Sequence, residues 1–161
     1  MLRLASALLG TLALAACDTA IVGFPPPSGS SPPGVKPVSE AGVSPDRYDN
    51  YETTDPALVC KDPRVTKGEE LWGTGLEAIE RDGTARAGEF DVAVSDARRA
   101  LAWRAAGDDT MRLAVLYAGT EAYVYRYSRI VAADARLAAG AEDEAPRAIR
   151  AVVFCYVEKN P

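Results

Sequence analysis

Carboxylates are the side chains of this chain that suit acid–base chemistry, and four of them lie close together in the sequence. Glu69, Glu70, Glu77 and Glu80 fall within the stretch "GEELWGTGLEAIE". Two carboxylates flanking a sugar linkage are the groups that cleave glycosidic bonds, and Glu70 with Glu77 is one such pair. The spacing selects no pair over another, however, and acidic residues on an amphipathic helix ordinarily face solvent. We therefore predict no catalytic residue on this segment.

The lack of histidine narrows the chemistry further. The 161-residue chain has no histidine, which excludes Ser-His-Asp and Cys-His relays and zinc sites built on histidine. It also has no Ser-x-x-Lys motif, no glycine-rich phosphate loop and no EF-hand loop. We expect a protein that is not an enzyme and that holds no metal or cofactor.

Three tyrosines form the one binding feature that the sequence suggests. Tyr123, Tyr125 and Tyr127 alternate in "AYVYRY" and would share one face of a strand. An exposed row of this kind stacks on sugar rings or forms the centre of a protein interface. A sheet face packed under a helix has the same pattern, and we favour that core position while keeping the tyrosines as the candidate binding strip.

The N-terminal residues combine a basic start with an apolar run. Arg3 precedes a run from Leu4 to Ala16 that only three small or polar residues interrupt. This run is too short to cross a bilayer, for which about 20 apolar residues are needed. The run ends in Leu14-Ala15-Ala16-Cys17, an order that resembles the lipobox of bacterial lipoproteins. A plain signal peptide beside a chance cysteine is the alternative.

The resemblance implies a membrane anchor. Residues 1–16 would be a signal peptide that is removed, and the Cys17 thiol would carry diacylglycerol, with a further acyl chain such as palmitate on the new amine. Two or three acyl chains hold a protein stably at a membrane. Asp18 resembles the signal that keeps enterobacterial lipoproteins on the inner membrane, so we expect a domain that faces the periplasm, with the inner membrane favoured.

Charge and composition limit the partners. The net charge of −5 becomes about −6 when Arg3 leaves with the signal peptide, so we expect no nucleic-acid ligand. Most prolines lie between Pro25 and Pro63, in a stretch without helical or strand periodicity. We therefore predict a disordered tether from Cys17 to residue 56, spanning about 35 Å as a flexible coil. Its "YDNYETTDP" end is alternatively a docking segment that orders on a partner.

The rest of the chain, residues 57–161, has the composition of a single globular domain. The two other cysteines, Cys60 and Cys155, lie at its opposite ends. Disulfides persist in exported proteins, so we predict a Cys60–Cys155 bridge, with two buried free thiols as the alternative.

Patterns within this domain favour an α+β fold. We predict helices over 66–81 and 95–109, the first with a strand and turn as the alternative, and a strand over 89–94. Residues 111–131 favour a hairpin that turns at 118–120 over a strand followed by a helix. Residues 148–159 predict an interior strand, because both of its faces are apolar. Together these make a small antiparallel sheet with one or two helices on a face.

Two functions of different classes fit this organisation. We expect an envelope lipoprotein that acts as a non-catalytic accessory subunit or adaptor and binds an envelope protein. The alternative is a glycan-binding module or a glycan-acting enzyme of the cell wall that uses a carboxylate and the tyrosine strip.

Overall fold

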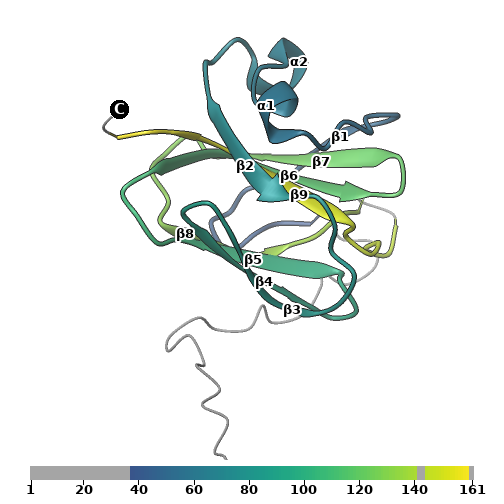
Figure 1. Ribbon diagram of the computed structural model, residues 1–161. Coiled ribbons are helices and arrows are strands. Elements are labelled where there is room, and N and C mark those ends of the chain that lie inside the picture. Colours follow the sequence, from purple (N-terminus) through teal and green to yellow (C-terminus); the bar gives the residue numbers. More distant parts are fainter. Residues whose placement is uncertain (1–36, 141–143, 160–161) are drawn as a thin grey trace, which may run out of the picture.

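The computed structural model describes residues 37–140 and 144–159, and these form two antiparallel sheets with two helices of a single turn each (Figure 1). The signal peptide, Cys17 and residues 18–36 of the expected tether lie outside the described residues. Within the described part, no helix has the length and apolarity needed to cross a membrane.

The larger sheet has five strands and the smaller has four. The order in the larger sheet is β1 (Asp46–Tyr48), β7 (Glu121–Arg126), β6 (Thr110–Ala118), β9 (Ala151–Val157) and β2 (Trp72–Leu76). The order in the smaller sheet is β3 (Gly83–Ala87), β4 (Phe90–Ser95), β5 (Ala100–Ala105) and β8 (Ala133–Leu137).

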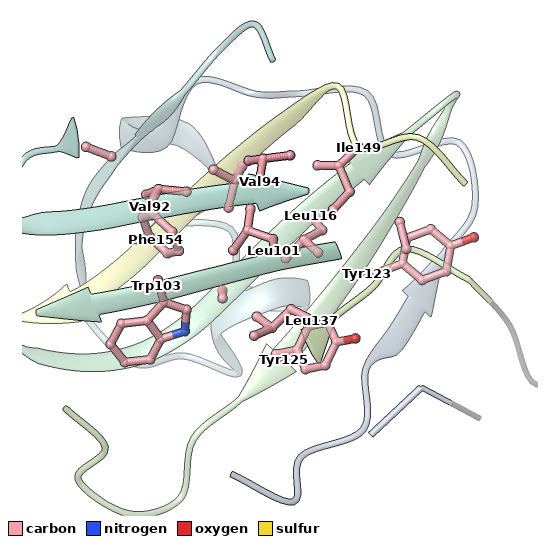
Figure 2. Close-up of a cluster of buried hydrophobic side chains, with 14 of the residues drawn as sticks. Val92, Val94, Leu101, Trp103, Leu116, Tyr123, Tyr125, Leu137, Ile149 and Phe154 are labelled. Atoms are coloured by element: carbon pink, nitrogen blue, oxygen red, sulfur yellow. The ribbon is translucent and has the colours of Figure 1, made fainter. Parts of the chain in front are cut away.

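The two sheets pack face to face around an aromatic core (Figure 2). The ring of Phe90 lies 5.9 Å from that of Trp103 and 5.4 Å from that of Phe154, so β4, β5 and β9 meet at one cluster. Aromatic pairs at these separations add to the stabilisation that burial alone gives. The predicted antiparallel sheet is confirmed, and two short helices do lie on one of its faces, but a second sheet that we did not expect covers the other face.

A smaller apolar layer lies on the other face of the five-stranded sheet. Helices α1 (Pro56–Val59) and α2 (Pro63–Thr66) cover this face, on the side away from the smaller sheet (Figure 1). Asp55 and Asp62 cap the two helices, and each is followed by a proline at the first helical position, a favoured arrangement for a helix start. Each Asp-Pro pair is a helix-start signal that the sequence analysis missed.

Four predicted strands are confirmed. Residues 151–157 form β9, which lies between β6 and β2, and its two apolar faces contact the two apolar layers. Residues 90–95 form β4. Strands β6 and β7 form the predicted hairpin, with Ala118 opposite Glu121 across a turn of Gly119 and Thr120.

The predicted helix over 95–109 is wrong, because these residues form a tight turn followed by strand β5. Three successive residues, 96–98, have positive φ angles of 57°, 53° and 65°. The carboxylate of Asp82 stabilises this turn by accepting hydrogen bonds from the N–H groups of Ala97, at 3.0 Å, and Arg98, at 2.6 Å. The turn thus depends on a contact outside the local sequence, and burial in the sheet overrides the high helix propensity of its alanines.

The predicted helix over 66–81 is wrong, because Thr66 ends α2 and residues 72–76 form strand β2, in agreement with the alternative. Gly73 explains why a strand fits at this place, because β2 lies directly beneath α1. A Cβ atom on Gly73 would collide with the carbonyl oxygen of Pro56 and would lie 2.9 Å from the sulfur of Cys60. Helix α1 can therefore approach this strand only where the side chain is absent.

The expected domain boundary at residue 56 is wrong, because the folded part begins earlier. Strand β1 pairs with β7, with Arg47 opposite Tyr123. Tyr51 is buried and stacks on Tyr117 at 6.4 Å between ring centres. The "YDNYETTDP" segment thus orders on its own domain. Its two tyrosines contribute apolar surface to that packing, and the tether prediction, which rested on proline content, did not take them into account.

Candidate functional site

The predicted Cys60–Cys155 disulfide is confirmed, with an S–S distance of 1.99 Å. Both cysteines are fully buried in the apolar layer under the helices. The bond joins the end of α1 to β9, two segments separated by 95 residues in the sequence. Its position within this layer is that of a structural cross-link.

The proposed tyrosine strip is buried and is therefore not a binding surface. Tyr123, Tyr125 and Tyr127 point into the space between the two sheets, and each is no more than 3% exposed. Figure 2 shows Tyr123 and Tyr125 within the core, Tyr125 beside Leu137. The smaller sheet covers these three tyrosines. The core position that we favoured is therefore correct, although a sheet and not a helix covers it.

The hydroxyl groups of this strip serve the fold. Tyr127 accepts a hydrogen bond from the indole N–H of Trp103 at 3.0 Å and donates one to Asp134 at 2.9 Å. The other carboxylate oxygen of Asp134 accepts the backbone N–H of Ala41 at 2.8 Å. Burial and the charge of Asp134 raise the pKa of Tyr127 well above its ordinary value. This chain of hydrogen bonds fixes the N-terminal segment to strand β8.

The four carboxylates of the segment 69–80 do not come together. Glu69 and Glu70 precede strand β2, whereas Glu77 and Glu80 follow it. An extended chain rises about 3.3 Å per residue, so Glu70 and Glu77 lie on the order of 20 Å apart along it. Glycosidase carboxylates lie about 5–10 Å apart. This pair is therefore not placed for glycan cleavage.

Two other carboxylates have a lowered pKa, and both belong to structural clusters. Hydrogen bonds from Arg64 lower the pKa of Asp62 to about 2, and the hydroxyl of Tyr123 lowers the pKa of Glu121. Glu121 also pairs with Arg47 at 2.8 Å and with Arg147 at 3.0 Å. A general acid at neutral pH requires the opposite shift, so these carboxylates suit ion pairing.

The exposed residue Trp72 is the feature that sequence reasoning missed. It begins β2 at an edge of the larger sheet, and 58% of its surface is exposed. A hollow of about 620 Å³ adjoins it, between β2 and the loop that follows α2, with walls that include Pro63, Glu70 and Leu71. Large exposed aromatic side chains beside a hollow are typical of binding surfaces.

Tyr156 lies next to Trp72 on the same sheet face, because the two are opposite each other in the pairing of β2 with β9. Its ring contacts Phe90 at 5.4 Å between ring centres. Burial and the nearby charges of Asp109, Glu158 and Glu89 raise the pKa of Tyr156, in that order of effect. We call Trp72, Tyr156 and these three carboxylates, together with Glu70, the Trp72 corner.

A second hollow, of about 470 Å³, lies beside the loop between β7 and β8. Ile130 in its wall is 80% exposed. Its buried carboxylate, Asp134, is already bound to Tyr127 and to backbone N–H groups. The surface polar groups Arg129 and Glu40 contact Ala41 and Arg136 respectively.

Among the described residues, no group of three or more His, Cys, Asp or Glu side chains is placed to hold a metal ion. The Trp72 corner combines three features that suit binding, namely an exposed aromatic side chain, a hollow and an edge strand.

No model of a known protein family matches the chain, and no curated protein or solved structure is similar enough to count as a match.

Proposed function

We propose that this chain is a lipid-anchored protein of the bacterial cell envelope whose β-sandwich binds another protein without catalysing a reaction. The order Leu14-Ala15-Ala16-Cys17 supports the anchor. The predicted tether, now limited to residues 18–36, would lie between the anchor and the domain. A tether raises the local concentration of a domain near a partner at the same membrane.

The exposure of Trp72 is the observation that carries the binding proposal. The other tryptophan, Trp103, is fully buried and hydrogen-bonded in the core. Trp72 instead leaves more than half of its surface in water, at a hydrophobic cost that a partner would remove. Tryptophan is among the residues most enriched at the centres of protein interfaces.

The test is crosslinking in membranes followed by affinity purification of the C-terminally tagged protein and mass spectrometry. We expect one partner in stoichiometric amount, lost with Trp72→Ala and kept with Ile130→Ala. Ile130 is the matched control because it is also large, apolar and exposed, but on a different loop. The same proteins recovered from the Trp72→Ala variant would contradict the binding proposal.

The anchor is tested separately with Cys17→Ala. We expect the variant to move from the membrane fraction to the soluble fraction, and we expect the N-terminal peptide of the unchanged protein to carry the mass of acyl chains. An unmodified cysteine at this position would contradict the anchor.

The alternative function, glycan binding, has a distinct outcome in the same experiments. Recovery of the protein with isolated cell wall, without a protein partner, would favour it. The tyrosine strip cannot support this alternative, because all three rings are buried. Trp72 is the aromatic ring that a sugar would then contact.

A further inference from the structure

We propose that the partner binds as an extended segment rich in lysine and arginine, which pairs with β2 and adds a sixth strand to the five-stranded sheet. This inference rests on the proposed function and names the mode and chemistry of binding. Strand addition at a free edge gives affinity through the backbone, and pockets for alternate side chains give specificity.

The edge of β2 is open to such pairing. Strand β2 ends its sheet, and within the described ranges its backbone makes no hydrogen bond beyond those with β9. Antiparallel pairing uses only half of the N–H and C=O groups of an edge strand, so the others point outward. Gly73 is exposed and Gly75 is partly exposed. Because glycine has no side chain, what they expose is backbone.

The other three sheet edges carry the charges that ordinarily block such pairing. Strand β1 has three residues, two of them charged, β3 contains Arg86, and β8 contains Asp134 and Arg136. The sequence of β2 is Trp-Gly-Thr-Gly-Leu, with no charge and no proline. Proteins protect edge strands with charges, prolines or irregular pairing. Of the edges in the described part of the chain, β2 alone lacks this protection.

Charge selects the chemistry of the added segment. Glu70 and Glu77 flank the strand, and Asp109 and Glu158 lie near Tyr156. No ion pair of these four carboxylates occurs among the described residues, whereas the neighbouring cations Arg86, Arg112 and Lys159 are paired with Glu89, Glu69 and Asp108. One more cation, Lys61, lines the hollow beside Trp72 and makes no ion pair in the described part of the chain, so the four carboxylates outnumber it. A lysine or arginine placed over Trp72 would be attracted both to the face of the indole ring and to these carboxylates.

The same field disfavours a second copy of this chain as the occupant. Two β2 edges paired with each other would bring two sets of these carboxylates together. Like charges directly opposite each other destabilise strand pairing, and the chain as a whole carries a net charge of −5. A basic segment from another protein meets no such repulsion.

Peptide selection tests the proposal even while the partner is unidentified. Random ten-residue peptides displayed on phage are selected against the protein purified from membranes in detergent. We expect enrichment of lysine or arginine at alternate positions, and we expect the best peptide, made synthetically, to change the fluorescence of exposed Trp72. Trp72→Ala should weaken its binding about thirtyfold, a typical loss for a tryptophan at an interface centre, whereas Ile130→Ala should leave it unchanged.

Two matched comparisons test the mode and the charge. The peptide has two alternating sets of backbone amides, and only one set pairs with β2. N-methylation of that set should abolish binding, whereas N-methylation of the other set should leave binding unchanged. The triple variant Glu70→Gln, Asp109→Asn, Glu158→Gln should bind at least about tenfold more weakly at low salt. The variant Glu80→Gln is its control, since Glu80 lies beyond the far end of β2.

Each failure has a distinct meaning. No selected peptide, selected peptides without basic residues, or binding that survives both patterns of N-methylation would overturn strand addition by a basic segment. A dimer in light scattering that Trp72→Ala dissociates would overturn it in favour of a second copy. If crosslinking still finds a Trp72-dependent partner, the proposed function stands without this mode of binding; if no partner is found, both proposals fail.

Discussion

Removal of the disulfide should lower the free energy of unfolding of this domain by nearly the whole stability of a marginally stable small protein, about 5 kcal/mol. The Cys60–Cys155 bond closes a loop between residues 95 apart, and the chain-entropy relation gives about 4.7 kcal/mol for a loop of this length. Unfolding entropy is about 2.1 cal/mol/K per residue. Over roughly 120 folded residues, the loss corresponds to a fall of about 19 °C in Tm. We expect this fall for the double variant Cys60→Ala, Cys155→Ala.

Urea and thermal unfolding, monitored by circular dichroism, measure the effect. Leu58→Ala is the control, because Leu58 lies on the same helix and is 61% exposed; we expect a change within about 0.5 kcal/mol for it. Both sulfurs are fully buried, so we also expect dithiothreitol to reduce the bond only as fast as the domain opens. A fall in Tm below about 5 °C would refute the argument that the bond acts by restricting the unfolded chain.

Three further variants test the local arguments. Tyr127→Phe should destabilise the domain by about 2–4 kcal/mol in urea unfolding, because it leaves a buried indole N–H without an acceptor and removes the donor to one oxygen of the buried Asp134 carboxylate, whose other oxygen keeps its backbone N–H groups; an effect no larger than that of Tyr156→Phe, whose hydroxyl bonds to no described residue, would contradict this. Gly73→Ala should destabilise by more than about 2 kcal/mol, since its Cβ would collide with α1; an unchanged Tm would mean that α1 can shift freely. The pKa of Asp62 is lowered to about 2 from 3.8, so its stabilisation is complete above about pH 4 and is lost as the pH falls toward 2. Asp62→Asn should therefore unfold at lower urea concentration than the unchanged protein at pH 7 but at a similar one at pH 2; parallel curves at all pH values would contradict the ion pair.

The predictions from sequence were correct where the pattern itself reflects the environment. Strand β9 has apolar residues on both faces because an apolar layer lies on each side, and the two cysteines at the ends of the domain pair as expected. The hairpin of β6 and β7 follows from the density of tyrosine and valine around Gly119. In these segments local preference and tertiary position agree.

The errors lie where a distant residue decides the local structure. The turn before β5 needs Asp82, which lies more than a dozen residues earlier in the chain. The alanines that follow it have a high helix propensity, yet Ala100 and Ala102 are buried in the smaller sheet, where small side chains suffice. No window of sequence around these alanines contains that information, so the helix prediction was bound to fail.

The residues of β2 can be divided by what packing requires of them. Gly73 and Gly75 are required, because a Cβ at either position would collide with the backbone of α1 or β9. Trp72 points to the opposite face, where 58% of its surface is exposed and where a lysine would protect the edge. The fold therefore explains the glycines and leaves the exposed tryptophan unexplained. A large aromatic side chain kept in water at an unprotected edge is what a binding site for an extended segment requires.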